Sequence, residues 1–179
     1  MDIDLLSRLS TEVGPSGFED RVRRVIRGGL VSDYADDVRV DNMGNLIARV
    51  GDGSFKVLIS AHMDEVGVMV SHIDQRGFLR IVPIGGLDPW ALLDKELIFM
   101  GKDGDVVGVV GVDPPHLRKE KPPSKFEELY VDAGFSSRDE ALKNGIVPGT
   151  QVHLQVVLGR GGVLWLLGRH LIIGLVVPF

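Results

Sequence analysis

The sequence contains no cysteine, and this absence excludes several kinds of chemistry at once. Disulfides, thiolate metal ligands and cysteine nucleophiles are all ruled out. A basic leader is also missing: the first residues, Met1–Asp4, are acidic, and no long apolar run follows them, so no signal peptide is indicated. A chain without cysteine is compatible with a reducing compartment, and we expect a cytoplasmic protein.

Positive charge is in short supply as well. The formal net charge is −5, and no basic stripe runs through the sequence, which argues against a nucleic-acid-binding protein. The apolar share of 44% and the charged share of 25% are typical of a globular protein. With 179 residues, the chain is long enough for one domain with a real core or for two small domains.

Acidic residues disappear from the last part of the chain. The last one is Glu140, and residues 141–179 contain neither aspartate nor glutamate. From Leu158 onward, glycines are scattered among leucine, valine and isoleucine with no helical or strand period. This tail is either a membrane segment, which the central Arg169-His170 pair disfavours, or a core segment of a larger fold.

The N-terminal third predicts two helices followed by strands. Leucine and valine at helical spacing predict a helix over residues 2–13, and Ser16–Glu19 is a capping-box pattern that would open a second helix ending near Gly28. Residues 38–50 predict a strand, a turn and a strand. The nearly all-apolar run at 55–61 predicts a buried strand in the middle of an α/β layer.

After residue 66 the pattern changes to short, closely spaced strands, which favours a small β-barrel or sandwich. The predicted strands cover residues 66–73, 78–84, 97–100, 106–112 and 152–157. A short helix is expected over residues 137–145, with Ser137 as its cap and Gly145 as its stop.

The segment with the strongest chemical signal follows the predicted strand at 55–61. In extended backbone, His62 and Asp64 lie on the same side, so the imidazole can bind a metal ion while the carboxylate orients the ring. The spacing alone has low specificity, since a His-x-Asp pair is more often a surface pair or a satisfied hydrogen bond. Its position after a buried strand, where α/β proteins place their sites, strengthens the metal-site hypothesis.

The other histidines are weaker candidates. We expect His72 on the barrel surface, His116 in a solvated loop with a ligand role as the alternative, and His153 at an exposed strand position. His170 lies in the tail. Neither a serine nucleophile elbow nor a phosphate-binding glycine loop is present in the sequence.

Several segments together resemble one peptidase family. They are Pro15–Glu19, Asp41–Asn45, Ala61–Gly67 and Pro115–His116, with residues 132–136 and 145–150 fitting the same pattern. In these segments the chain resembles the tetrahedral aminopeptidases, which are dinuclear-metal glutamyl or broad-specificity aminopeptidases often mislabelled as endoglucanases. The resemblance extends in order over about residues 3–152.

The resemblance implies an α/β fold: an incomplete catalytic domain of the zinc-exopeptidase type with an inserted small β-barrel. The implied boundaries are 1–65 for the catalytic part, 66–157 for the barrel and 158–179 for the atypical tail. It further implies two divalent ions, zinc or cobalt, peptide substrates, and homo-oligomers from dimers to dodecamers. From the net charge and the charged pair in the tail, we expect neither nucleic-acid nor membrane partners. Carried over by position, His62 is a metal ligand and Asp64 is the carboxylate that orients it.

The chain also departs from the family. After about Gln151 the family's Asp-Asp-Arg segment, Glu-Glu pair, further Asp and final His do not follow. We therefore expect a metalloaminopeptidase by family that is inactive as this chain, with a non-catalytic, self-associating β-barrel module as the alternative. A reading-frame slip is a third interpretation of the tail, and sequencing the encoding DNA tests it, because an adjacent frame should then encode the missing motifs.

Overall fold

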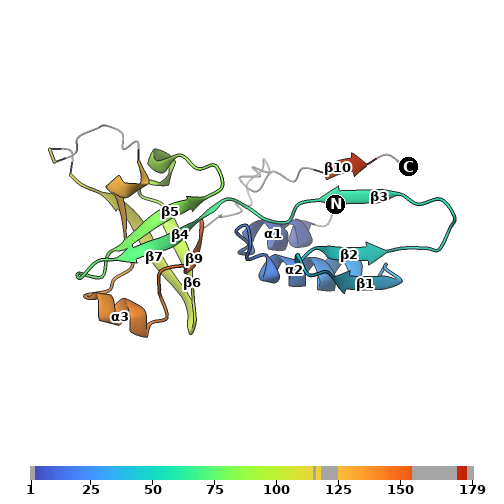
Figure 1. Cartoon of the computed structure of the whole chain (residues 1–179), viewed down its shortest axis with the longest axis horizontal. Helices are drawn as coiled ribbons and strands as arrows, with labels where there is room; N and C mark the ends of the chain where they lie inside the picture. The colour runs from blue at the N-terminus through green and yellow to red at the C-terminus, as the bar shows by residue number, and fades with distance from the viewer. Residues whose placement is uncertain (1–2, 115, 118–124, 155–172, 177–179) are drawn as a thin grey trace. The chain divides into compact units, whose positions relative to one another are not determined.

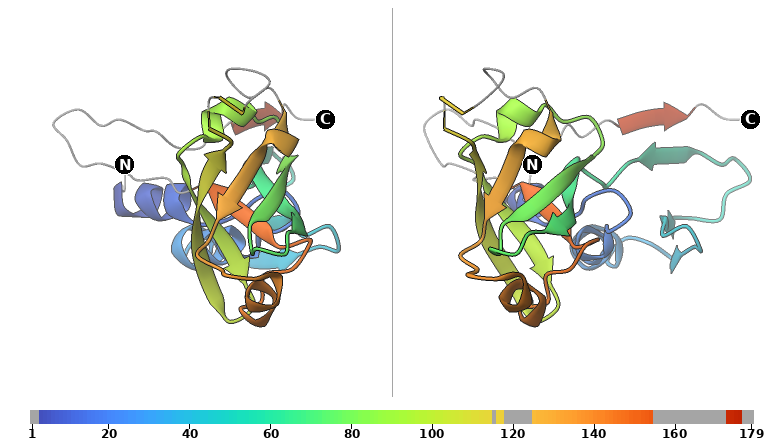
Figure 2. Two further views of the ribbon diagram at one scale, coloured as in Figure 1. Left: turned by 90° about the vertical axis from the view of Figure 1, so that its left-hand side faces the viewer. Right: turned by 60° about the vertical axis from the view of Figure 1, so that its left-hand side comes forward.

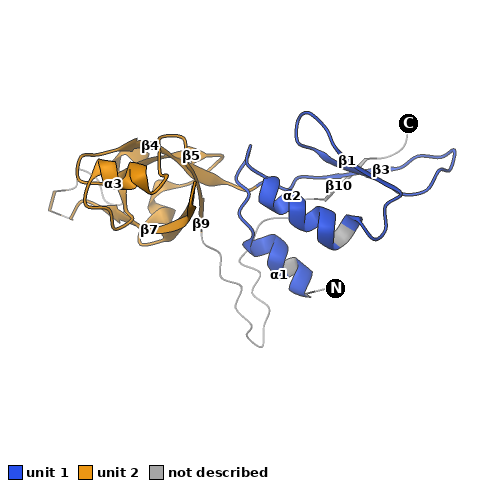
Figure 3. Ribbon diagram, turned by 90° about the horizontal axis from the view of Figure 1, so that it is seen from below, with its two compact units in different colours: residues 1–64, 156–179 blue, residues 65–155 orange. Residues whose placement is uncertain are grey.

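The computed structural model describes residues 3–114, 116–117, 125–154 and 173–176 (Figure 1). The chain divides into two compact units, one formed by residues 1–64 and 156–179 and the other by residues 65–155 (Figure 3). Each unit has its own secondary structure and its own buried side chains.

The N-terminal unit begins with two helices that lie side by side (Figure 3). Helix α1 spans Ile3–Thr11, within the predicted range, and α2 spans Asp20–Ile26 before continuing as a π-helical segment, Arg27–Val31. The predicted apolar faces produce a small core, whose most buried apolar members in this unit are Val13, Val22 and Val25.

The predicted capping box at the start of α2 is wrong. Glu19, not Ser16, is the residue before the helix, and no side chain caps it. The Ser16 hydroxyl donates a hydrogen bond to Asp64 instead, while the Glu19 carboxylate accepts from the Gly17 amide at 2.6 Å. The serine hydroxyl binds a charged acceptor 48 residues away in the sequence. This partner is favoured because a hydrogen bond to a charged group is stronger than one to a neutral amide.

The predicted strand, turn and strand are confirmed as the antiparallel hairpin of β1, Asp37–Val40, and β2, Leu46–Arg49. Asp41 shapes the turn, because its Oδ1 accepts hydrogen bonds from the amides of Met43 and Asn45, both at 2.9 Å. Gly44 has a φ of +85°, a conformation that costs other residues strain.

Strand β3, Leu58–Ala61, corrects a second prediction. It forms where expected but is exposed along its whole length, with Leu58 at 65% and Ile59 at 67% exposure. Within the described residues its sheet partner is β10, Ile173–Val176, in antiparallel register. Apolar character predicted a buried strand, but burial needs covering elements, and the described elements leave both faces of β3 open.

The second unit confirms the predicted small β-barrel. Its six strands are β4 (Gly67–Ile73), β5 (Leu79–Ile84), β6 (Glu96–Gly101), β7 (Gly104–Val112), β8 (Leu129–Asp132) and β9 (Gln151–Leu154). They close in the order β4-β5-β8-β7-β6-β9, and every pairing is antiparallel. Strand β8 was not predicted, because it has only four residues and follows a proline-rich loop.

The barrel encloses a continuous apolar core, because alternate side chains of each strand point inward. Its buried members are Val68, Val70, Ile73, Leu79, Ile81, Leu92, Leu97, Phe99, Val110, Leu129, Val131, Ala141, Ile146 and Val152. Strands β7 and β8 approach so closely that a Cβ on Gly108 would lie 2.8 Å from Cγ1 of Val131. Two short 3-10 helices, Pro89–Leu92 and Phe126–Glu128, interrupt the connections.

One end of the barrel is covered by helix α3, Arg138–Lys143 (Figure 2). The predicted cap is confirmed, since the Ser137 hydroxyl accepts a hydrogen bond from the Glu140 amide at 3.2 Å. Ala141 of this helix and the nearby Ile146 belong to the barrel core.

Most of the atypical tail lies outside the described residues, which after Leu154 comprise only β10. The interpretations of residues 158–179 as a membrane segment, a core segment or a frame slip therefore fall, apart from β10, outside the described residues. Among the described residues, every helix is too short or too polar to cross a membrane.

Candidate functional site

The site centres on the loop that follows β3. His62 and Asp64 face each other there, with Nδ1 of His62 at 3.0 Å from Oδ1 of Asp64 and 3.2 Å from its carbonyl oxygen. The side chains are 47% and 36% exposed. Because the carboxylate engages Nδ1, any ligand role of the ring falls to Nε2.

A third residue, Ser16, completes the arrangement from the turn before α2. Its hydroxyl donates to Oδ2 of Asp64, so the two carboxylate oxygens are held by different partners. This hydrogen bond lowers the pKa of Asp64 more than burial raises it, and the contact with His62 lowers it further. Asp64 is therefore a fixed anion at neutral pH, which suits a carboxylate that orients an imidazole.

Ser16 was not predicted as a site residue. The Pro15-Ser16-Gly17-Phe18 segment was part of the family pattern, but the Ser-x-x-Glu spacing assigned its hydroxyl to the helix. Only the fold brings residues 16 and 64 together. The sequence did offer one indication of such a residue. A carboxylate that orients a metal ligand is usually itself hydrogen-bonded, and the sequence motif assigned no hydrogen-bond donor to Asp64.

The residue after Asp64 makes a separate buried contact in the second unit. Glu65 Oε1 lies 2.6 Å from Nδ1 of His153, whose side chain is only 1% exposed. The two atoms are close without being aligned as a hydrogen bond. The prediction of an exposed His153 is wrong: strand alternation placed it opposite the buried Val152, but Glu65 lies against it and shields it from water.

The remaining candidates are not brought to the site. His72 and His116 are exposed, as predicted, and His170 lies outside the described residues. Within the described part of the chain, no group of three or more His, Cys, Asp and Glu residues is placed to hold a metal ion. The structure thus joins Ser16, His62 and Asp64 into a cluster that offers one imidazole ligand.

Comparison with known proteins gives a consistent family. The model described as M42 glutamyl aminopeptidase matches residues 44–160. The lysyl aminopeptidase of Pyrococcus furiosus is 40% identical over 154 residues, covering 84% of this chain and 44% of that protein.

Solved structures agree. An aminopeptidase from the archaeon Desulfurococcus kamchatkensis matches with a TM-score of 0.77 and 32% identity, covering 90% of this chain and 45% of that one. The Pyrococcus horikoshii TET1 peptidase matches with a TM-score of 0.78 and 32% identity, covering 88% and 47% of the two chains.

These matches confirm the resemblance inferred from the motifs and the predicted fold class, an incomplete catalytic domain with a small β-barrel. The chain spans less than half the length of the relatives it matches.

Proposed function

This chain belongs to the M42 glutamyl aminopeptidase family, and we propose that it supplies the first part of a metal-dependent centre that removes N-terminal residues from peptides. The observation that supports this is the Ser16–Asp64–His62 chain of contacts, which orients one imidazole through an anionic carboxylate. The same proposal treats residues 66–157 as a domain inserted into the catalytic part.

In this proposal His62 is a metal ligand through Nε2, Asp64 is its positioning carboxylate, and Ser16 fixes the carboxylate. A bound divalent ion, zinc or cobalt, would lower the pKa of a water molecule and so supply the nucleophile. The family's two-ion centre needs more ligands than the described residues bring together. The chain therefore supplies one ligand of the centre with its positioning residues, and no hydrolytic step is assigned to it alone.

The activity of this chain is the direct test. Purified protein with added zinc or cobalt should not hydrolyse aminoacyl-p-nitroanilides at enzymatic rates, because loss of a general base alone costs about 10²–10⁴-fold in rate. Turnover at rates normal for an aminopeptidase would refute the proposed inactivity.

Metal binding tests the residue roles separately. By calorimetry, we expect weak zinc binding to the full chain and a loss of about tenfold or more in affinity for His62→Ala and for Asp64→Asn. His72→Ala is the matched control, since His72 is an exposed histidine away from the cluster. Equal losses in all three variants, or two tightly bound ions per chain, would contradict the assignment.

A second candidate function is a non-catalytic module that self-associates. The closed barrel favours it, because that unit has a complete core and also presents apolar side chains outward, among them Val107 at 53% and Val109 at 45% exposure. The TET1 peptidase can assemble into a tetrahedron or a large octahedral shell. Sedimentation analysis decides: a monomer at micromolar concentration rules out this function, and a discrete oligomer without turnover supports it.

A further inference from the structure

The buried pair of Glu65 and His153 has no part in the proposed function so far. Oε1 of Glu65 lies 2.6 Å from Nδ1 of His153, and the two side chains are only 9% and 1% exposed. Among the described residues, only Ser10 and Thr150 are further buried polar residues. Taking an ionisable carboxyl group out of water is costly, so filling space does not explain its presence there.

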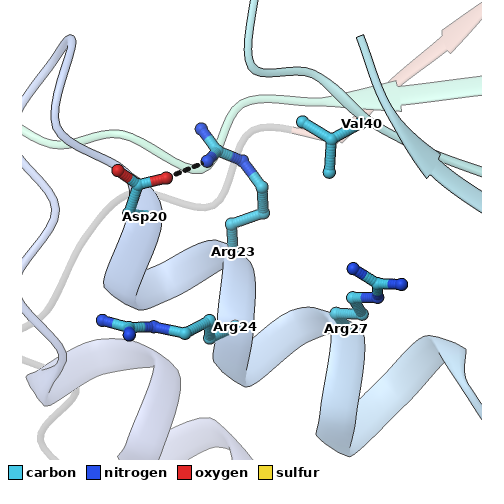
Figure 4. A pocket seen from close by; sticks show the side chains of 5 residues that line it. All are labelled: Asp20, Arg23, Arg24, Arg27 and Val40. Atoms are coloured by element: carbon cyan, nitrogen blue, oxygen red, sulfur yellow. Dashed lines mark hydrogen bonds and ion pairs between the residues drawn. The ribbon is translucent and has the colours of Figure 1, made fainter.

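Two ion pairs elsewhere in the described structure lie at the surface. On α2, Arg23 pairs with Asp20, whose side chain is 83% exposed (Figure 4). In the turn between β4 and β5, Arg76 is 75% exposed beside Asp74. Water solvates such pairs, and they add little to stability. The Glu65–His153 pair is a different kind of contact, because both of its groups are nearly out of water.

Stability alone is a poor explanation for a buried ionisable pair. Apolar side chains of similar volume often stabilise a fold as well or better, because the pair loses its hydration on burial. Buried polar groups are best attested where they select one arrangement of the chain over others. The position of Glu65 in the chain shows which arrangement this pair can select.

Glu65 directly follows Asp64, and the peptide that joins them belongs to the candidate site. Nδ1 of His62 lies 3.0 Å from Oδ1 of Asp64 and 3.2 Å from the Asp64 carbonyl oxygen. That carbonyl is part of the planar peptide that ends at the amide nitrogen of Glu65. A change in the backbone angles of Glu65 therefore turns an oxygen that contacts the imidazole.

Side chains hold this peptide on both of its sides. On the carbonyl side, the Asp64 carboxylate is fixed by the hydrogen bonds of the site. On the nitrogen side, Glu65 is held against His153 of β9. The following residue, Val66, packs closely too, since a Cβ on Gly85 would lie 3.0 Å from its Cγ1.

We propose that Glu65 and His153 are positioning residues of the candidate site. Their contact holds the peptide between residues 64 and 65 so that its carbonyl faces Nδ1 of His62, which leaves Nε2 of the ring for a metal ion. This inference rests on the ligand role proposed for His62.

One double variant separates positioning from stability. Glu65→Met combined with His153→Leu replaces the pair by apolar side chains, and the thermal melting temperature of the chain should stay the same or rise. Glu65→Gln keeps the shape of the side chain without its charge and gives a second variant with a milder change.

NMR of the His62 ring is the readout, because it needs no enzymatic activity. Long-range proton–nitrogen spectra show which ring nitrogen carries the proton, and a zinc titration in the same spectra measures binding at this ring alone. Above the usual histidine pKa of about 6.5, we expect the proton on Nδ1 in the wild type, since both contacts of that nitrogen are oxygen acceptors. The double variant should show a mixture of both tautomers and bind zinc at His62 about tenfold more weakly, as when a residue that supports a metal ligand is lost. Glu65→Gln should lie in between.

The matched control is Thr150→Val, which replaces another buried polar group of the same unit and should leave the His62 signals unchanged. An unchanged tautomer and zinc affinity in the folded double variant would overturn the proposal, as would equal changes in Thr150→Val. If the double variant loses its melting transition, Glu65→Gln decides by the same two readouts. A wild-type ring that carries its proton on Nδ1 and loses this preference in the variants, but binds no zinc, would support the positioning role and refute the proposed ligand role of His62.

Discussion

The two units of this chain differ in how completely they bury their apolar side chains. Residues 65–155 form a closed barrel, and 14 of the buried apolar side chains in the described structure belong to its core. Among its described residues the N-terminal unit has three, Val13, Val22 and Val25, and it leaves the apolar strand β3 exposed. Closure removes sheet edges and supplies a core from within one segment, whereas an open layer depends on further elements.

The difference has a functional counterpart. The candidate metal ligand lies in the incomplete unit, directly after the exposed strand, and the complete unit contains no cluster of metal-ligating residues among its described positions. The chain thus contains one unit with a complete core and one unit with an incomplete set of candidate metal ligands. This agrees with a chain that spans less than half the length of its relatives.

The largest expected effect comes from separating the two units. A fragment of residues 65–155 should fold by itself and melt cooperatively, because its sheet is closed and its core is internal. A fragment of residues 1–64 should show little cooperative structure. Thermal circular dichroism and proton–nitrogen NMR of both fragments measure this, and a cooperatively folding N-terminal fragment would break the comparison.

Truncating one leucine in each unit gives the next effect. Leu97→Ala in the barrel, where the side chain is 0% exposed, should lower the free energy of unfolding by about 2–5 kcal/mol through lost burial and a cavity. The same change at Leu58 in β3, 65% exposed, should stay within about 0.5 kcal/mol. Urea denaturation of the full-length variants compares them. A comparable cost at Leu58 would mean that β3 is covered in solution.

A polar pair gives a smaller effect in the complete unit. His153→Ala should lower the free energy of unfolding of the barrel by about 2 kcal/mol, because a side chain that is 1% exposed is removed together with its contact to Glu65. His72→Ala is the matched control, an exposed histidine of the same barrel, and should be nearly neutral. Similar costs for the two histidines would show that the Glu65 contact adds no stability.

Local patterns in the sequence were sufficient for most of the elements. Helix α1, the β1–β2 hairpin, the Ser137 cap and five of the six barrel strands follow from periodicity and turn residues that act over a few positions. Strand β8 escaped, since four residues after a proline-rich loop give too short a pattern.

The errors concern burial and long-range partners. Apolar residues in β3 predict a buried strand only if covering elements exist, and strand alternation at His153 does not reveal that Glu65 lies against it. The Ser16–Asp64 contact joins positions 48 residues apart, which no local rule connects. The sequence motif predicted the pair of His62 and Asp64. Ser16, which holds the Asp64 carboxylate, could be identified only from the fold.

The smallest expected effect concerns a kind of turn that occurs once in each unit. In the hairpins, Oδ1 of Asp41 accepts the amides of Met43 and Asn45, and Oδ1 of Asp74 accepts those of Arg76 and Phe78. Hydrogen bonds to Asn45, chiefly from its side chain, lower the pKa of Asp41. At Asp74 burial raises the pKa, but the hydrogen bonds from Phe78 and Arg76 outweigh it, so this pKa is lowered too.

Since both folded pKa values lie below the unfolded one, each turn contributes stability above the unfolded carboxyl pKa of about 3.9 and loses it as the pH falls through the folded value. Carbon NMR titration of the two carboxyl groups should therefore give midpoints that are both lower than in unfolded peptides. Because this turn chemistry is local, the two midpoints should shift in the same direction even though one unit is complete and the other is not. An ordinary pKa at Asp41 with a lowered one at Asp74 would mean that the β1–β2 hairpin forms only when its unit is completed, which would extend the incompleteness of that unit from its core to its turns.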